Sequence, residues 1–232
     1  MTAERGARSA RIAPDHLVVA ARTLDEGAAW CEATLGVVPA PGGKHPLMAT
    51  HNRLLAIGSA RFPRTYLEII AIDPQAPVPQ RPRWFDLDAA ELLRTIAVAP
   101  RLVHWVARTA DIEASAAALR SAGFDQGAVT AAERMTPRGL LRWRITVRDD
   151  GGRAARGAVP LLIEWGDEHP SDALPESAVR LEAIAVGGIA APLAALLGVD
   201  AAAPAERQPA SPLCAILDTP RGRVELRAPD AS

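Results

Sequence analysis

The pattern of apolar and polar positions predicts the same order of elements twice along the chain: a strand, a helix and then further strands. The first predicted helix begins after Thr23, which forms a capping-box pattern with Glu26, and it ends at Gly36. Short apolar runs bounded by Gly and Pro are typical of strands, whereas apolar residues at every third or fourth position are typical of helices. In the first run these rules predict a strand at 16–21, a helix at 24–35, a loop at 41–46, and strands at 53–57 and 64–72.

The same order restarts after a segment at 73–88 that is rich in proline and predicts a linker. A short helix at 89–98 completes this connection. The second run then predicts a strand at 102–108, a helix at 112–122, a hairpin turn at Arg138-Gly139, and strands at 140–147 and 161–165. A third, incomplete run predicts a strand at 181–186, a helix at 191–197, and strands at 213–217 and 223–227.

A glutamate recurs within the last strand of each run. Glu68 lies within the apolar segment 66–72, Glu164 lies within 161–165, and Glu225 is a weaker third copy. An unpartnered charge is costly in such a strand. Each glutamate therefore either faces solvent on alternate pleats or points at a positive group.

Two histidines open the equivalent first strands, His16 in the first run and His104 in the second. Two imidazoles and two carboxylates are a plausible ligand set for a divalent metal such as Zn, Ni, Mn or Fe, with no thiolate to select a soft ion. One glutamate could leave such a metal and act as a base. In the alternative interpretation, the histidines are core residues and the glutamates pair with arginines.

Composition narrows the class of protein. The chain has 232 residues, 49% hydrophobic and 23% charged, with a net charge of −1, which is typical of a soluble globular protein. Lys44 is the only lysine, and the arginines form no cluster, so we expect no nucleic-acid partner. Two cysteines, Cys31 and Cys214, are too few for a disulfide framework. No signal peptide or membrane span is recognisable, so a cytoplasmic location is expected.

Several blocks of sequence together resemble the vicinal oxygen chelate superfamily, and within it the glyoxalase-like domain proteins. The blocks are Asp15-His16-Leu17-Val18-Val19, Pro41-Gly42-Gly43-Lys44-His45-Pro46, Ala49-Thr50-His51-Asn52-Arg53-Leu54, Tyr66-Leu67-Glu68, Arg83-Trp84-Phe85, and Ile163-Glu164-Trp165 with His169-Pro170. The resemblance covers most of the chain from Asp15 to about Ser171. Its most specific part is the Gly-Gly-x-His-Pro block followed by Thr-His-Asn-Arg.

The resemblance implies an α+β fold in which tandem βαβββ units form a curved mixed sheet around a cleft. A third partial βαββ unit at the C-terminus would extend it, either covering a sheet edge or leaving a homodimer surface. The expected boundaries are a disordered tail at 1–13, a first unit at 14–73, a linker with a short helix at 74–100, a second unit at 101–170 and the partial unit at 178–228.

The same resemblance gives the four metal-ligand places of a glyoxalase I-like centre to His16, Glu68, His104 and Glu164. Glu68 and Glu164 are then also the candidate catalytic residues. The candidate substrate-binding residues are polar groups expected to cross the mouth of the cleft and aromatic residues expected to line it: His45, His51, Asn52, Trp105 and Trp165. Polar contacts within the loop, and packing in the core, are the alternatives for these two groups.

Two functions of different classes follow. The first is a divalent-metal-dependent lyase, isomerase or dioxygenase that acts on a small molecule with vicinal oxygens. The second is a metal-free protein that binds or sequesters a small molecule in the same cleft. No nucleophile elbow and no phosphate-binding loop is present in the sequence, which disfavours hydrolase and nucleotide-binding functions.

Overall fold

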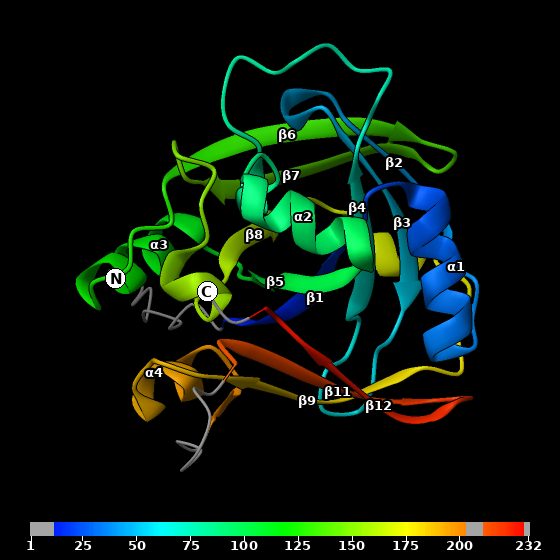
Figure 1. The fold of residues 1–232 in the computed structure, drawn as a ribbon. Helices are drawn as coiled ribbons and strands as arrows, with labels where there is room; N and C mark the ends of the chain where they lie inside the picture. Colours follow the sequence, from blue (N-terminus) through cyan, green and yellow to red (C-terminus); the bar gives the residue numbers. More distant parts are fainter. Residues whose placement is uncertain (1–11, 203–210, 230–232) are drawn as a thin grey trace, which may run out of the picture.

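An eight-stranded mixed sheet forms the body of the molecule, and each half of it comes from one of the two runs (Figure 1). The computed structural model describes residues 12–202 and 211–229, so most of the predicted tail at 1–13 lies outside the described residues. The first half contains β1 (Ala13–Ala20), α1 (Leu24–Leu35), β2 (Ala40–His45), β3 (Thr50–Ala56) and β4 (Tyr66–Ile72). The second half contains β5 (Arg101–Arg108), α3 (Ile112–Ser121), β6 (Ala128–Thr136), β7 (Gly139–Val147) and β8 (Leu161–Trp165).

The strand order is β2-β3-β4-β1-β5-β8-β7-β6, which confirms the predicted α+β fold with a mixed sheet. In each half the first strand pairs in parallel with the last one, β1 with β4 and β5 with β8. The two halves join where β1 runs antiparallel to β5. The sheet curves so strongly that its outer strands β2 and β6 contact each other, and its concave face becomes nearly enclosed.

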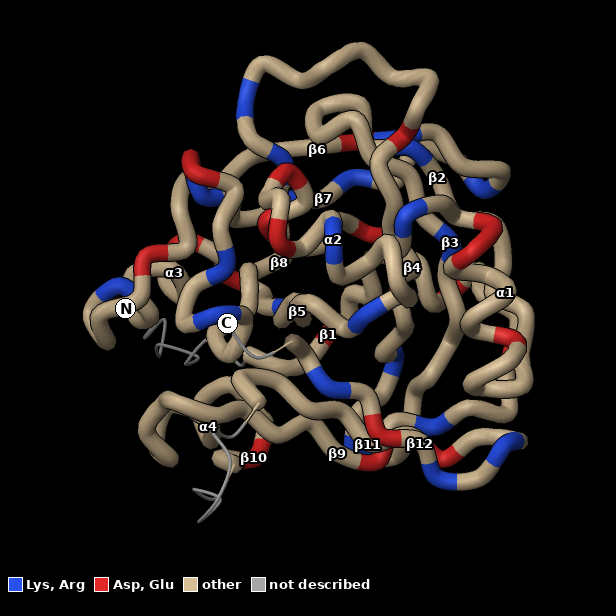
Figure 2. Tube along the Cα trace, viewed as in Figure 1, with Lys and Arg blue, Asp and Glu red and all other residues tan. Residues whose placement is uncertain are grey.

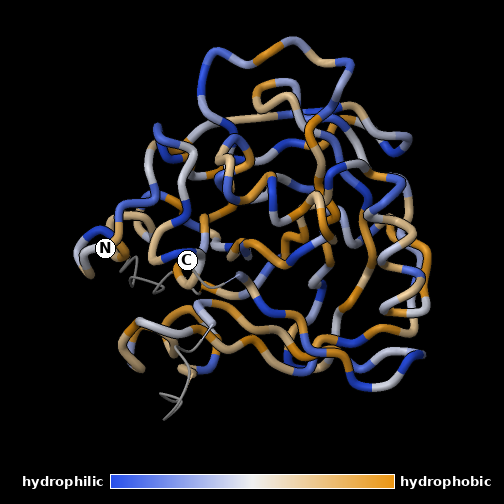
Figure 3. Tube along the Cα trace, viewed as in Figure 1, coloured by the Kyte–Doolittle hydropathy of each residue, from blue (hydrophilic) through white to orange (hydrophobic). Residues whose placement is uncertain are grey.

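Apolar side chains fill one end of this concave face. The segment between the two halves folds back over it, with a short 3-10 helix at Trp84–Asp86 and the helix α2 (Ala90–Val98). Trp84, Phe85 and Leu92 pack there against residues of β1, β5 and β7. The strands at the centre of the molecule are correspondingly rich in apolar residues (Figure 3). Polar groups of the concave face lie next to these residues, since Trp84 and Phe85 line the same cavity as His16 and Glu68.

The convex face carries α1, α3 and a second sheet. This four-stranded sheet has the order β10-β9-β11-β12. It is built from β9 (Arg180–Val186), α4 (Ala191–Leu196), β10 (Asp200–Ala201), β11 (Leu213–Thr219) and β12 (Gly222–Arg227). Its buried residues share one apolar core with the outer side of the large sheet. The third run contains the predicted strand, helix and two later strands, and also the short strand β10, which was not predicted. β9 pairs with β10 and β11.

The first helix matches its prediction residue for residue. The Thr23 side chain accepts a hydrogen bond from the backbone of Glu26, and Gly36 ends the helix with a φ of 78°. In a full capping box the Glu26 side chain would also accept a hydrogen bond from the Thr23 backbone. Here it forms an ion pair with Arg22 instead.

The predicted loop at 41–46 is wrong, because residues 41–45 belong to the edge strand β2 and Pro46 begins a short 3-10 helix. Proline and glycine indicate a loop in most contexts, but they are tolerated at sheet edges and bulges. Here the pairing of β2 with β3 shifts register between Pro41 and Lys44. The strand β6 was also not predicted, since its alternation of small and charged residues gives a weak apolar signal.

Charged residues of both signs are distributed over the chain trace (Figure 2). Within the described part of the chain, no helix has the length and hydropathy that crossing a membrane requires.

Candidate functional site

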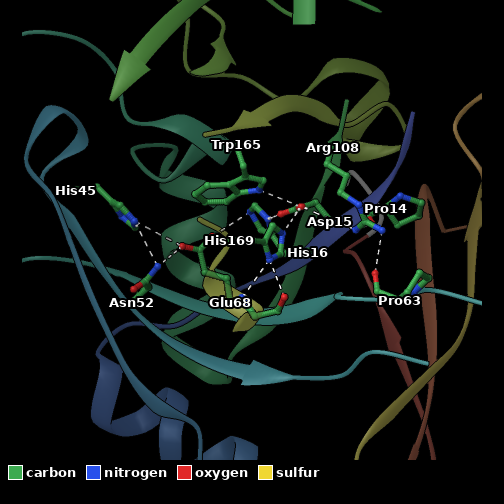
Figure 4. Close-up of polar contacts among 11 residues, drawn as sticks. Pro14, Asp15, His16, His45, Asn52, Pro63, Glu68, Arg108, Trp165 and His169 are labelled. Atoms are coloured by element: carbon green, nitrogen blue, oxygen red, sulfur yellow. Dashed lines mark hydrogen bonds and ion pairs between the residues drawn. The ribbon is translucent and has the colours of Figure 1, made fainter. Parts of the chain in front are cut away.

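Glu68 lies in the middle of β4 and points into the concave face of the sheet (Figure 4). Only 5% of it is exposed to solvent. Its Oε1 accepts a hydrogen bond of 2.6 Å from Asn52 Nδ2. Its Oε2 lies 3.6 Å from His16 Nε2, which is beyond hydrogen-bond distance. One oxygen of the carboxylate is therefore held, and the other faces the imidazole across a short gap.

The Gly-Gly block holds Asn52 in place. The backbone N–H of Gly43 donates a 2.7 Å hydrogen bond to Asn52 Oδ1, which directs the amide nitrogen toward Glu68. A Cβ atom at Gly42 would lie 2.0 Å from Asn52 Oδ1 and 2.6 Å from the Asn52 carbonyl oxygen. Only glycine permits this approach of β2 and β3. The most specific block of the sequence thus supports the carboxylate.

His45 completes the support on the same side of Glu68. Its Nδ1 lies 3.1 Å from Thr50 Oγ1, and its Nε2 lies 3.3 Å from Asn52 Nδ2. Burial lowers the pKa of His45 to about 4, against the opposing charge of Glu68. His45 is therefore neutral near pH 7. Its Nε2 accepts from the Asn52 amide, and its Nδ1–H donates to Thr50.

A second buried carboxylate, Asp15, holds the opposite side of the site. Its two oxygens contact His16 Nδ1 at 2.7 Å, His169 Nε2 at 2.9 Å and Trp165 Nε1 at 3.1 Å. Burial disfavours ionisation of Asp15, but the hydrogen bonds from His16 and His169 hold its pKa well below its usual range. Asp15 is therefore ionised. It fixes the His16 ring so that Nε2 faces Glu68.

These groups line a small inner cavity of about 30 Å³. Its walls are largely aromatic, with Tyr66, Trp84, Phe85, Trp143 and Trp165. The Tyr66 ring stacks on His16, with ring centroids 4.6 Å apart. Burial raises the pKa of Tyr66 well above its usual value, so the phenol stays protonated.

The inner cavity adjoins an outer cleft of about 590 Å³. Four residues line both spaces: Leu54, Arg134, Leu141 and Pro170. The outer cleft lies between the β6–β7 hairpin and the segment after β8. Its volume falls in the range of small-molecule sites, roughly 300–1,000 Å³. A ligand in the outer cleft can therefore extend a few atoms into the inner cavity beside Glu68.

Two of the four expected metal ligands lie elsewhere. The Glu164 carboxylate points off the convex face, where it accepts a 2.8 Å hydrogen bond from the backbone of Ile112 at the start of α3 and lies 3.3 Å from an Arg144 nitrogen. His104 is fully buried beside Phe85, and its Nε2 accepts a hydrogen bond from the backbone of Leu161. Burial lowers the pKa of His104 well below its usual value.

The register of the strands explains why the two glutamates differ. Glu68 pairs with Val18, two residues beyond His16, so Glu68 and His16 share a face. The β5–β8 pairing instead ends with Arg108 opposite Ile163, which places Glu164 one step beyond Arg108. Because that position is an odd number of residues from His104 along the strand, the side chains of Glu164 and His104 point to opposite faces of the sheet. Trp165, not Glu164, reaches the cavity.

The remaining expected contact residues divide in the same way. His45, Asn52 and Trp165 line the inner cavity. His51 lies on the opposite pleat of β3 from Asn52 and does not line it. Trp105 is fully buried in the convex-side core, where its Nε1 donates to the Ala158 carbonyl oxygen.

The donor set does not fit a divalent metal. His16 and Glu68 lie together, but no three His, Cys, Asp or Glu side chains gather closely enough to hold a metal ion anywhere in residues 12–202 and 211–229. The Nδ1 of His16 is bonded to Asp15, and Oε1 of Glu68 is bonded to Asn52. A catalytic zinc site usually has three protein ligands.

Three residues without a predicted role also lie at the site: Asp15, His169 and Arg134. An acid directly before His16 in an apolar strand was a usable signal, because a buried carboxylate requires a partner. His169 lies in a loop and Arg134 in the unpredicted strand β6, and only the tertiary fold brings these two residues to the cleft.

Comparisons with known proteins agree with this architecture. The model of the family described as "Glyoxalase-like domain" matches residues 15–201. A hypothetical protein from Staphylococcus aureus has a similar structure, with a TM-score of 0.53 and 16% identity over 95% of this chain and 88% of that one.

The methylmalonyl-CoA epimerase from Mycobacterium tuberculosis also matches, with a TM-score of 0.39 and 18% identity over 75% of this chain and 97% of that one. No curated protein matches the chain. Because the family model spans most of the chain, the protein belongs to the glyoxalase-like domain family of the vicinal oxygen chelate superfamily.

Proposed function

We propose that the protein is an isomerase or lyase that removes a proton from carbon in a small substrate, with Glu68 as the base. The substrate carbon would lie next to a carbonyl or similar oxygen, so that the resulting anion is delocalised onto that oxygen. The observation that supports the proposal is the burial of Glu68 and the contacts of its two carboxylate oxygens. Glu68 is a buried carboxylate with one oxygen fixed by Asn52 and the other facing the inner cavity.

His16 supplies the complementary group. Because Asp15 binds its Nδ1, the ring presents Nε2 to the cavity in a fixed orientation. With its Nδ1–H donating to Asp15, His16 carries a proton on Nε2 only in its imidazolium form, and this form can donate that proton to the oxygen on which negative charge develops. Such a donor, already aligned before the reaction, stabilises the transition state without reorganisation. Glu68 and His16 thus form a base and an acid on one wall of the cavity.

The dimensions of the two spaces determine how a substrate would lie. The inner cavity of about 30 Å³ has room for only a few atoms. The reacting end would fit there, among aromatic walls that exclude water and strengthen charge interactions. The remainder of the molecule would lie in the outer cleft.

Exchange of carbon-bound hydrogen with solvent tests the proposal. A panel of small carbonyl compounds and organic acids is incubated with the protein in D₂O, and loss of the C–H signal is followed by proton NMR. Glu68→Gln keeps the shape of the side chain but removes the base, so exchange should slow by about 10²- to 10⁴-fold. Exchange at an unchanged rate in Glu68→Gln, or no exchange of any compound by the native protein, would contradict it.

Binding without turnover is the second candidate, favoured by the aromatic walls of the cavity. In that case ligands bind with equal affinity to the native protein and to Glu68→Gln, and no C–H signal is lost. Trp84, Trp143 and Trp165 line the cavity, so intrinsic fluorescence reports binding independently of exchange.

A further inference from the structure

Arg134 is one of three arginines that line the outer cleft, with Arg138 and Arg142. It lies on β6, where even-numbered residues turn inward and the neighbouring Glu133 and Met135 are exposed. It lines both the inner cavity and the outer cleft. A Cβ atom on Gly43 would lie 1.6 Å from Arg134 Nη1, so the guanidinium rests on the backbone of β2. The side chain thus reaches from one edge strand of the sheet to the other and borders the inner cavity.

Arg134 has no anionic partner within the described residues. Two other arginines line the outer cleft. Arg142 lies 3.2 Å from the Glu133 carboxylate, whereas Arg138 donates to the backbone carbonyl oxygen of Asp172 and does not line the inner cavity. No carboxylate of the described chain lies within ion-pair distance of Arg134. A half-buried guanidinium that lines a cleft without a counterion is a ready site for an anion, because its planar fork matches two oxygens.

A second donor points to the same ligand chemistry. Trp84 lines the inner cavity and is only 7% exposed. Its indole Nε1 is buried and has no hydrogen-bond acceptor within the described residues. A buried donor normally has an acceptor. An oxygen atom of a ligand in the cavity that Trp84 lines could supply the missing one.

We infer that the substrate is an organic acid whose carboxylate binds Arg134, with the Trp84 indole N–H donating to a substrate oxygen. The inference rests on the proposed function and adds the substrate class to it. Because Arg134 lines the opening between the two spaces, an anchored carboxylate places the adjoining carbon toward Glu68. The guanidinium also offsets the repulsion between that carboxylate and Glu68, which would otherwise oppose binding.

Matched probe compounds test the substrate class. Linear carboxylates from acetate to hexanoate are each compared with the primary amide of the same length and with the corresponding alkyl phosphate. Binding is measured by tryptophan fluorescence and by ligand-detected NMR. The carboxylates should bind better than their amides, and Arg134→Gln should weaken carboxylate binding by about 10- to 100-fold. Arg134→Lys should recover only part of the loss, because an ammonium group cannot form the two-pronged contact.

Arg94→Gln is the matched control, since it removes the same charge from an exposed position on α2 that lines neither space. Its carboxylate affinity should equal that of the native protein. Far-UV circular dichroism and thermal unfolding establish that each variant is folded. Glu68→Gln separates this inference from the proposed function, because it should retain or strengthen carboxylate binding while abolishing exchange.

Three results would overturn the inference: equal affinity for carboxylates and amides, unchanged carboxylate affinity in folded Arg134→Gln, or binding of the phosphates alone. An absence of saturable binding by every carboxylate would do the same. If Glu68→Gln lost exchange while amides and carboxylates bound equally well, the role of Glu68 as the base would stand. Only the inference that the substrate carries a carboxylate would fail.

Discussion

At the scale of single residues, the site shows how context gives one residue type two roles. Glu68 and Glu164 both lie in apolar strands near the end of a βαβββ unit. Glu68 turns inward and is held by Asn52, whereas Glu164 turns outward and caps a helix. The difference is one step of strand register, which reverses the face of every side chain. A sequence pattern that aligns the two glutamates cannot detect that step.

Replacing Glu164 by glutamine should therefore affect stability and not chemistry. The substitution weakens the contacts of the carboxylate with the Ile112 N–H and with Arg144. Loss of such a helix-capping charge costs about 1 kcal/mol of unfolding free energy. Urea unfolding measures this loss. A stability unchanged from the native protein would show that Glu164 does not cap α3 in solution.

His45 should make the stability of the protein depend on pH. Its pKa is about 4 in the folded protein and near 6.5 in the unfolded chain. Between these values the unfolded chain binds a proton that the folded protein does not, so the free energy of unfolding falls as pH falls. The contribution is fully present above pH 6.5 and is lost down to pH 4, with a total on the order of 3 kcal/mol.

The measurement is urea unfolding of the native protein and of His45→Gln at about pH 7 and about pH 4.5. The native protein should lose more stability between the two conditions than the variant does. His104 is buried with a lowered pKa in both proteins, so its contribution cancels in the comparison. An equal loss in both would contradict the assignment of a depressed pKa to His45.

At the scale of elements, the edge strand β2 is the part of the fold that most directly shapes the site. Gly43 donates to Asn52 and lies under Arg134, and His45 at its end supports Asn52. Proline and glycine made this segment resemble a loop. The helix 24–35, in contrast, was predicted to the residue, because its cap and its terminal glycine are local signals. Edge strands lack such signals, since their pairing is decided by distant residues.

The two glycines of β2 should respond differently to substitution by alanine. At Gly42 the new Cβ would meet the backbone oxygen of Asn52 at 2.6 Å, and overpacking of this kind costs about 1–3 kcal/mol of stability. At Gly43 the conflict is with the flexible end of Arg134, which can move aside, so the cost should be below about 1 kcal/mol. Displacement of Arg134 should still weaken carboxylate binding.

Thermal unfolding and the carboxylate titration distinguish the two variants. Gly42→Ala serves as the control for general damage to β2. If Gly43→Ala bound carboxylates as tightly as the native protein, Arg134 would not be positioned by β2.

At the scale of the whole molecule, the fold class and the pairing of two units were predictable, because each unit repeats the same order of apolar runs. The composition of the site was predictable only in part. His16, Glu68, His45, Asn52 and Trp165 line one cavity, as the family resemblance implied. His104, Glu164, His51 and Trp105 do not line it. The β5–β8 register turns Glu164 to the other face, and strand alternation does the same for His51 beside Asn52 and for Trp105 beside His104.

The same arrangement predicts weak binding of divalent metals. His16 and Glu68 are two donors where a catalytic zinc site uses three protein ligands. Addition of Zn, Ni, Mn or Fe(II) should therefore shift the midpoint of thermal unfolding by less than about 1 °C, because weak ligands contribute little to stability. One tightly bound equivalent of metal that is lost in His16→Ala would contradict this prediction.

The central claim is that a single carboxylate, Glu68, performs the chemistry of the cleft. Its most direct test compares Glu68→Gln with Glu164→Gln in the D₂O exchange experiment, using the compound that the native protein exchanges fastest. The structure predicts that Glu68→Gln loses exchange by about 10²- to 10⁴-fold and that Glu164→Gln exchanges at the native rate. Equal losses in the two variants, or a loss in Glu164→Gln alone, would contradict the claim.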